Sequence, residues 1–242
     1  PQITPESTAA KPSEVYKPGA TLDRTLEYGG KTVPIYRDRP LNVFSDVDFI
    51  WTGEENENQR RLEYLGGEFR TRYGIDVSSF QGEIDWDAVA DDNIDFAMVR
   101  VGFRGTGTGS LNTDKYYEQN IRGAMRAGLE TGVYFFAQAV TVEEAIEEAD
   151  YVISLLDGLD INGPVAYDWE MHDSTYRVYG TSPEMATACA VAFCERIKDA
   201  GYTPMVYGGT YVTYMKYDQG ALADYLSWYP EYKSEKSEKL CP

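Results

Sequence analysis

Histidine and cysteine, the usual ligands of zinc and of redox centres, are almost absent from this chain of 242 residues. The single histidine is His172, and the three cysteines are Cys189, Cys194 and Cys241. Cys189 and Cys194 are five residues apart in a segment predicted to be helical, so their side chains point in different directions and do not pair easily. We therefore expect no metal site, no cofactor and no Ser-His-Asp triad, and we expect these two cysteines to pack as small apolar side chains.

Basic residues are also scarce. The chain has 22 lysines and arginines against 40 aspartates and glutamates, which gives a formal net charge of −18. Such an excess of negative charge repels nucleic acids and anionic lipid surfaces, so we expect no nucleic-acid partner. No run of 18 apolar residues occurs, so no membrane-spanning segment is expected. With 43% hydrophobic and 14% aromatic residues, the sequence still has ample material for a large core.

The first 72 residues differ in texture from the rest. The chain begins without a starting methionine or a charged-then-apolar leader, and we interpret it as processed or trimmed. Residues 1–33 are rich in proline, threonine, serine and charged residues, which predicts a linker or disordered segment. Residues 34–72 contain scattered apolar anchors, with a short strand at 33–36, and are predicted to pack as an extension on the main domain. The main domain is predicted to span residues 73–242.

From residue 73 onward, strand-like apolar runs alternate with helix-like segments. Alternation of this kind with short connections indicates a parallel sheet covered by helices. The count of strands fits either an open doubly wound sheet or a barrel, and the lack of a GxGxxG fingerprint after the first strand disfavours a dinucleotide fold. The strands are predicted at residues 73–77, 96–103, 132–137, 164–170, 204–207 and 226–229. The helices are predicted at residues 86–91, 114–127, 141–156 and 182–200, with a shorter one from about residue 211.

Two acids end one of these apolar strands. Asp168 and Glu170 are two residues apart, and side chains at i and i+2 of a strand lie on the same face. The carboxyl ends of parallel strands carry the active sites of α/β barrels and open sheets. Two close carboxyl groups push their pKa values apart, so one can stay protonated while the other stays charged, as glycoside hydrolysis requires. The alternative is a pair of exposed acids in the loop after a strand.

Other residues could join this pair. Asp76, inside the first strand of the main domain, is predicted to point toward the same mouth of the sheet. Arg100, on the following strand, is a candidate partner for one of the three acids. His172 lies just beyond the pair, either lining the cleft or exposed in a loop. The chain has 20 tyrosines, whose flat apolar faces and polar tips suit stacking on sugars, although many simply fill half-buried strand positions.

In their order along the chain, several segments together resemble the glycoside hydrolase family 25 lysozymes (N-acetylmuramidases) of bacteria and phages. Each segment is ordinary by itself, but their order and spacing make the resemblance specific. The segments are Tyr73-Gly74-Ile75-Asp76-Val77-Ser78, Ile84-Asp85-Trp86, Phe96-Ala97-Met98-Val99-Arg100, Gly132-Val133-Tyr134-Phe135-Phe136, Asp168-Trp169-Glu170 and Gly201-Tyr202-Thr203-Pro204-Met205-Val206-Tyr207.

The resemblance implies a modified α/β barrel of TIM-like form that cleaves the β-1,4 bond between N-acetylmuramic acid and N-acetylglucosamine in peptidoglycan, without a metal. It implies that Glu170 is the general acid/base and that Asp168 stabilises the cationic intermediate or orients the acetamido group of the substrate. Asp76 is implied as a supporting group in the cleft. The substrate-binding residues that we expect are Tyr134, Phe136, Arg100, Tyr207 and Trp169.

The chain departs from the family at its end. The family continues past its sixth strand with a Trp-Gln-Tyr strand and a further acidic site residue, whereas residues 228–232 read Trp-Tyr-Pro-Glu-Tyr here and the polar residues 233–242 show no strand pattern. We therefore expect a barrel that lacks its last two strands and one site aspartate. An unclosed barrel exposes strand edges, which predicts reduced stability, pairing with another chain, or closure by residues 34–72.

The expected partner is the glycan strand of peptidoglycan, and the expected location is extracellular or attached to a bacterial cell wall. One alternative is a non-catalytic peptidoglycan-binding protein on the same fold. Another is a different retaining glycosidase that acts on chitin-like polymers. The separation of the Asp168 and Glu170 carboxyl groups bears on the second alternative, because about 5–5.5 Å favours a direct nucleophile and a longer gap favours inversion or help from the substrate acetamido group.

Overall fold

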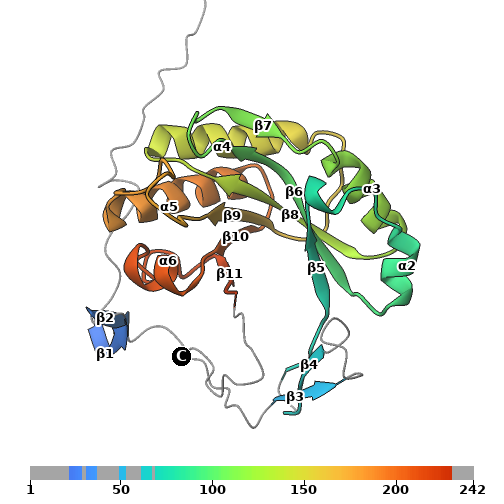
Figure 1. Cartoon of the computed structure of the whole chain (residues 1–242), viewed down its shortest axis with the longest axis horizontal. Helices are drawn as coiled ribbons and strands as arrows, with labels where there is room; N and C mark the ends of the chain where they lie inside the picture. The colour runs from blue at the N-terminus through green and yellow to red at the C-terminus, as the bar shows by residue number, and fades with distance from the viewer. Residues whose placement is uncertain (1–21, 29–30, 37–48, 53–60, 67–68, 231–242) are drawn as a thin grey trace, which may run out of the picture.

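The computed structural model describes residues 22–28, 31–36, 49–52, 61–66 and 69–230 (Figure 1). Its centre is one curled sheet of parallel strands that follow one another in the order β5, β6, β8, β9, β10 and β11. The alternating α/β prediction is confirmed, together with the six predicted strands. The strands are β5 (Gly74–Val77), β6 (Phe96–Arg104), β8 (Glu130–Ala137), β9 (Val165–Trp169), β10 (Pro204–Tyr207) and β11 (Leu226–Trp228). A short strand that was not predicted, β7 (Leu111–Thr113), pairs antiparallel with β6.

Helices cover the convex side of this sheet (Figure 1). The side chains of Asp85, Thr141 and Ser182 accept a hydrogen bond from a backbone N–H in the first turn of α2, α4 and α5. Gly128 and Gly201, with φ of 85° and 91°, follow α3 and α5 and stop them close to the ends predicted at residues 127 and 200. The helices are α2 (Trp86–Asp91), α3 (Tyr117–Arg126), α4 (Val142–Leu155), α5 (Pro183–Asp199) and α6 (Thr210–Met215).

Alternate residues of each strand face opposite sides of the sheet, and only the convex side carries the main core. On β9, Val165, Tyr167 and Trp169 are fully buried in the hydrophobic core shared with the helices. Asp168 therefore lies on the concave side. Cys189 and Cys194 of α5 are both buried and unbonded, which confirms their predicted role as small core residues.

The sheet is a half-barrel rather than a closed barrel. β5 and β11 stand at the two ends of the strand order, and within the described ranges no pairing joins them. The prediction that residues 34–72 close the barrel is wrong for the part of that segment that is described, because its strands pair elsewhere. β3 (Phe49–Thr52) and β4 (Arg61–Tyr64) form a separate two-stranded antiparallel sheet.

The N-terminal segments contain more structure than predicted. β1 (Leu22–Tyr28) pairs antiparallel with β2 (Lys31–Tyr36), so the end of the stretch predicted as a linker contains a strand. The strand predicted at residues 33–36 is confirmed as part of β2. Arg61 connects β4 to the main domain, because it forms an ion pair with Asp92 at 3.1 Å and its guanidinium lies 4.8 Å from the ring centre of Tyr73.

A buried ion pair lies behind the carboxyl ends of β6 and β8. Arg104 and Glu148 are 3% and 0% exposed, and the Arg104 Nε lies 2.8 Å from the Glu148 carboxylate. Arg104 also donates to the carbonyl of Gly109 at 2.8 Å and pairs with Glu147 at 2.7 Å. The same Glu148 oxygen accepts the backbone N–H of Gln138 at 3.0 Å. This pair therefore ties α4 to the chain that follows β6 and to the chain that follows β8.

The buried Glu148 carboxyl predicts a specific dependence of stability on pH. Burial raises the pKa of Glu148 from its ordinary 4.5 to about 7, although Gln138 and Arg104 favour the charged form. Between these values the folded protein keeps a proton that the unfolded chain releases, so the free energy of unfolding falls as pH rises, by up to about 1.4 kcal/mol per pH unit. Glu148→Gln removes this titration.

Chemical denaturation of both proteins between about pH 4 and pH 8 measures this effect. The stability of the wild-type protein should fall more steeply than that of Glu148→Gln across the window. The difference between the two curves isolates Glu148 from the other titrating groups, whatever the absolute stability of the variant. Parallel curves would show that Glu148 keeps an ordinary pKa.

Candidate active site

One cleft gathers acids and aromatic side chains from five strands of the sheet. Its volume is about 480 Å³, and it opens on the concave side at the carboxyl ends of β5, β8, β9, β10 and β11. The structure thus brings together the three acids and the two tyrosines that the sequence placed on four different strands. The residues that line the cleft are Asp76, Tyr134, Asp168, Glu170, Tyr207, Trp228, Tyr229 and Pro230.

Asp168 and Glu170 form a close pair of carboxyl groups. Asp168 is 7% exposed, and Glu170, two residues further along the chain, lines the same cleft. Burial, followed by the charge of Glu170, raises the pKa of Asp168 well above its ordinary value, while Arg100 acts in the opposite direction. The Asp168 carboxyl therefore keeps its proton to a higher pH than an ordinary aspartate does.

Asp76 and Tyr134 complete the polar surroundings of this pair. Partial loss of water raises the pKa of Asp76, and the charge of Glu170 adds to that increase. Burial also raises the pKa of the Tyr134 hydroxyl, with further contributions from Asp76 and Asp168. The Tyr134 phenol is therefore a hydrogen-bond donor at neutral pH rather than an anion. The cleft combines concentrated negative potential with a neutral phenol donor.

The backbone of Glu170 is held from behind by the buried polar network. The Gln138 side-chain amide donates to the Glu170 carbonyl at 2.8 Å, and Gln138 is itself fully buried. Arg177 donates to the Gln138 carbonyl at 2.9 Å and forms a two-pronged ion pair with Glu144 at 2.7 and 2.9 Å. The position of Glu170 therefore depends on contacts from three segments outside its own strand.

His172 contacts Glu170 on the solvent side. Its Nε2 lies 2.6 Å from Oε2 of Glu170, and its side chain is 62% exposed. The imidazole packs edge-on against the ring of Tyr176, with centres 5.3 Å apart. The sequence left open whether His172 lines the cleft or is exposed in a loop. In the structure it does both, because its side chain is largely exposed and also contacts the Glu170 carboxyl group. Glu170 thus stands between Asp168 on one side and His172 on the other.

Trp169 does not contact the cleft, which corrects its predicted role in substrate binding. Its side chain has no exposed surface, and its indole N–H donates to the Ala139 carbonyl at 3.0 Å. The ring packs 6.2 Å from that of Tyr217 on the convex side. The physical reason is strand alternation, since the residue between Asp168 and Glu170 must face away from them. Trp169 therefore packs in the core on the side of the sheet opposite to the two acids.

Arg100 pairs with a different acid from those considered in the sequence analysis. Its guanidinium binds Asp114 at 2.8 Å and donates to the Ser79 hydroxyl at 3.2 Å, so Asp76, Asp168 and Glu170 are not its ion-pair partners. Phe136 does not line the cleft either, and its ring lies 6.5 Å from that of Tyr176. Of the expected substrate-binding residues, the structure brings only Tyr134 and Tyr207 to the wall of the cleft.

Trp228 is the main feature of the cleft that sequence reasoning missed. Its ring lies 5.1 Å from that of Tyr207 and 6.1 Å from that of Tyr134, edge-on in both cases. The second contact spans from β11 to β8, which shows how strongly the sheet curls. Tyr229 and Pro230 follow Trp228 along the same wall. The signal was present, because Trp228 and Tyr229 end a predicted strand in the same way that the acids end β9.

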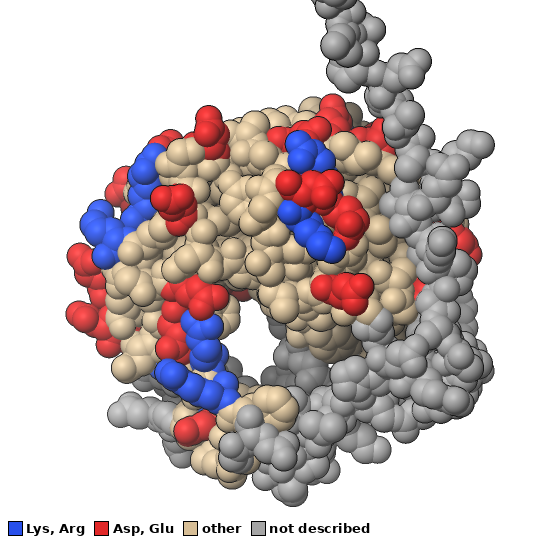
Figure 2. All heavy atoms as spheres, turned by 180° about the vertical axis from the view of Figure 1, so that it is seen from behind, with Lys and Arg blue, Asp and Glu red and all other residues tan. Residues whose placement is uncertain are grey.

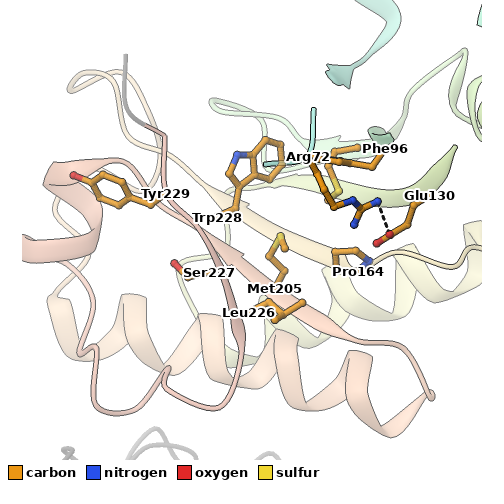
Figure 3. A pocket seen from close by; sticks show the side chains of 10 residues that line it. Arg72, Phe96, Glu130, Pro164, Met205, Leu226, Ser227, Trp228 and Tyr229 are labelled. Carbon is orange, nitrogen blue, oxygen red and sulfur yellow. Dashed lines mark ion pairs between the residues drawn. The ribbon is translucent and has the colours of Figure 1, made fainter. Parts of the chain in front are cut away.

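A second pocket occupies the opposite end of the concave face (Figure 3). Its volume is about 430 Å³, and Phe96, Met98, Met205 and Leu226 give it an apolar floor. The negative charge of Glu130 in this pocket is balanced by Arg72, whose side chain points to it and pairs with it at 2.8 Å (Figure 3). This pocket has the lining of a barrel interior and lacks a carboxyl pair. The chemistry of the concave face is therefore concentrated at the carboxyl ends of the strands.

Charges elsewhere on the described surface are mixed. On the face shown in Figure 2, basic side chains lie beside acidic ones and do not gather in a patch of their own. Arg122 with Glu118 and Arg196 with Asp150 form such pairs, at 2.8 and 2.6 Å. Within the described ranges, no three histidine, cysteine, aspartate or glutamate side chains are grouped to hold a metal ion. None of the described helices is long and apolar enough to cross a bilayer.

A parallel α/β sheet with paired carboxyl groups at its strand ends is typical of glycoside hydrolases built on α/β barrels. Comparison with known proteins specifies the group. The family described as "Glycosyl hydrolases family 25" matches residues 75–241. The chain belongs to this family, which confirms the resemblance seen in the sequence.

Individual relatives agree with this assignment. The chain is 26% identical to the autolytic lysozyme of Clostridium acetobutylicum over 164 residues, which are 67% of this chain and 46% of that protein. Two solved structures share its fold. The spore cortex lytic enzyme SleM of Clostridium perfringens aligns with a TM-score of 0.57 and 22% identity, covering 69% of this chain and 55% of that one. A muramidase from Trichobolus zukalii aligns with a TM-score of 0.54 and 22% identity, covering 71% and 82%. The chain thus spans about half the length of the first two.

Proposed function

We propose that this protein is a muramidase that hydrolyses the β-1,4 bond between N-acetylmuramic acid and N-acetylglucosamine in peptidoglycan. The observation that carries the proposal is the pair of Asp168 and Glu170 at the end of β9, in a cleft walled by tyrosine and tryptophan. Membership of family 25 supports it, as do relatives named lysozyme and muramidase. The expected place of action is the bacterial cell wall, outside the membrane.

The raised pKa of Asp168 gives the pair its chemical role. In the free protein, burial favours the proton on Asp168. When a glycosidic oxygen reaches Glu170, Asp168 passes the proton to Glu170 and becomes the anion that faces the developing positive charge. Glu170 then protonates the leaving oxygen as the bond from this oxygen to the anomeric carbon breaks. Water adds to the sugar, and its proton returns to Glu170.

The position of the two carboxyl groups also bears on the nucleophile. A direct nucleophile requires a separation of about 5–5.5 Å, with the anomeric carbon between the two carboxyl groups. Asp168 and Glu170 project from the same face of one strand end rather than from opposite sides of the cleft. We therefore infer attack by the acetamido oxygen of the substrate itself, with Asp168 orienting and charge-stabilising that group. This preference suits substrates with an N-acetyl group at the cleaved residue.

Digestion of purified peptidoglycan tests the proposed bond. The released fragments are labelled with borohydride at their new reducing ends and identified by mass spectrometry. A muramidase leaves muramic acid at those ends. New ends on glucosamine would identify a different glycosidase, and cleavage of chitin polymers in preference to peptidoglycan would favour the chitin-like alternative. No release of fragments by protein that still sediments with walls would identify a binding protein.

A further inference from the structure

The most exposed large apolar side chain in the described part of the molecule is Phe80. It is 85% exposed, whereas the next, Tyr179, is 59% exposed. A phenyl ring that remains in water forgoes the stabilisation that its burial would contribute. Single exposed apolar side chains are common on protein surfaces. Phe80 differs from a side chain on a mobile loop if hydrogen bonds fix its backbone.

The backbone around Phe80 is held on both sides. Phe80 is the middle residue of the single-turn helix η2 (Ser79–Gln81). The Ser78 hydroxyl accepts the backbone N–H of Phe80 at 3.2 Å, and the Gln81 side chain accepts the backbone N–H of Ser78 at 2.8 Å. The carboxylate of Asp114 accepts the backbone N–H of Ser79 at 2.9 Å. This reciprocal capping fixes the turn that presents the ring.

The ring itself rests on a second fixed group. The Arg100 guanidinium lies over one face of Phe80, 5.1 Å from its centre, and also 5.3 Å from the ring centre of Phe103. Arg100 is locked by its ion pair with Asp114. One face of Phe80 is therefore covered by a rigid cation, and the high exposure of the side chain leaves the other face to solvent.

This platform stands beside the proposed active site. Phe80 follows β5 four residues after Asp76, so it lies beyond the carboxyl end of the strand, on the side of the sheet to which the cleft opens. Arg100 is opposite Tyr134 in the β6–β8 register, and Tyr134 lines the cleft. Along the sheet, Phe80 is on the β5 side of the acids, and Trp228 is on the β11 side. A glycan strand that runs across the sheet from Trp228 past the acids heads toward the β5 side, where Phe80 lies.

We propose that Phe80 is a stacking platform for a pyranose ring of the glycan strand, at a subsite beyond the cleft on the β5 side. The occupant is a sugar because its C–H face is apolar while its edges stay hydrated, which suits one open aromatic face in water. A platform that is already rigid costs little ordering when the sugar binds. The inference rests on the proposed function, because it names how a long glycan extends past the bond that is cut.

Binding of N-acetylglucosamine oligomers of two lengths tests the platform. In a Glu170→Gln background, which prevents cutting, Phe80→Ala should weaken calorimetric binding of a hexamer about threefold to tenfold, the usual worth of an aromatic contact. Binding of a dimer that fills only the cleft should not change. Phe80→Tyr should restore the hexamer affinity, and with cleavable peptidoglycan Phe80→Ala should raise KM while kcat stays unchanged.

The matched control is Phe69→Ala, which removes an exposed aromatic side chain at the other end of β5 and should leave hexamer binding unchanged. Equal affinities of Phe80→Ala and its parent for the hexamer would overturn the platform. So would equal losses for hexamer and dimer, because the variant would then disturb the cleft itself. If the parent binds neither oligomer nor purified peptidoglycan, the proposed function fails together with the platform; if the wild-type protein cuts and Phe80→Ala cuts with the same KM, only the platform fails.

Discussion

Glu170→Gln should abolish cleavage of peptidoglycan while leaving the protein bound to walls. Glutamine has the size of glutamate and can keep its contact with the glycan chain. Its amide cannot deliver a proton to the glycosidic oxygen. General acid–base catalysis contributes about 10²–10⁴ in rate, so kcat should fall by at least this factor. The backbone carbonyl of residue 170 still accepts from Gln138, so the position of the side chain is preserved. Release of labelled reducing ends and sedimentation with purified walls measure the two properties separately.

The control for this variant is Glu118→Gln, which makes the same chemical change on the exposed surface of α3, where Glu118 pairs with Arg122. It should cut peptidoglycan at the wild-type rate. The two outcomes discriminate between an enzyme and a wall-binding protein on the same fold. If Glu170→Gln and wild type release fragments equally, Glu170 is not the acid and the proposed mechanism is wrong. If wild type releases none while binding walls, the domain is a binding module.

Arg104→Met should destabilise the protein by about 3–5 kcal/mol, the usual cost of leaving one buried charge without its partner. Glu148 is fully buried, and Arg104 forms an ion pair with it at 2.8 Å. Without the guanidinium, Glu148 must either stay charged in a dry site or take up a proton at neutral pH. The carbonyl of Gly109 also loses a donor. The free energy of unfolding from denaturant titration gives the magnitude directly.

Two further variants make this prediction specific to burial. Arg196→Met removes the exposed ion pair with Asp150 and should cost less than about 1 kcal/mol. Arg104→Met combined with Glu148→Leu removes both buried charges and should recover much of the loss, because an apolar replacement leaves nothing unpaired. A cost for Arg104→Met no larger than that of Arg196→Met would show that the buried pair contributes little. Arg104→Met should also disturb the position of Glu170 in the cleft, because Glu148 binds Gln138 and Gln138 donates to the Glu170 carbonyl.

Much of the fold could be predicted from local sequence. The helix starts at Asp85, Thr141 and Ser182 and the stops at Gly128 and Gly201 depend on backbone hydrogen bonds and dihedral angles within a few residues, and the structure confirms them. β7 was missed because three residues show too little periodicity to reveal a strand. β1 was missed because its segment has the composition of a linker.

The candidate site, too, could be predicted only in part from local sequence. Alternation along β9 and the rule that parallel strands align their carboxyl ends are enough to place Asp168 and Glu170 together and to bring Asp76 close. The same alternation, applied to Trp169, would have turned it away from the cleft. Trp169 belongs to the same motif as the two acids, but its position between them on the strand turns its side chain to the opposite face, where it is fully buried.

By itself, the sequence determined the alternating elements, the family and the acids at the strand ends, because each of these follows from local pattern or from ordered motifs. Only the tertiary structure decided that Arg100 binds Asp114, that His172 touches Glu170 and that Trp228 reaches Tyr134. These contacts depend on the curl of the sheet and on competition among several acids for each cation. Such choices are settled by distances between segments remote in the chain, and no local pattern encodes those distances.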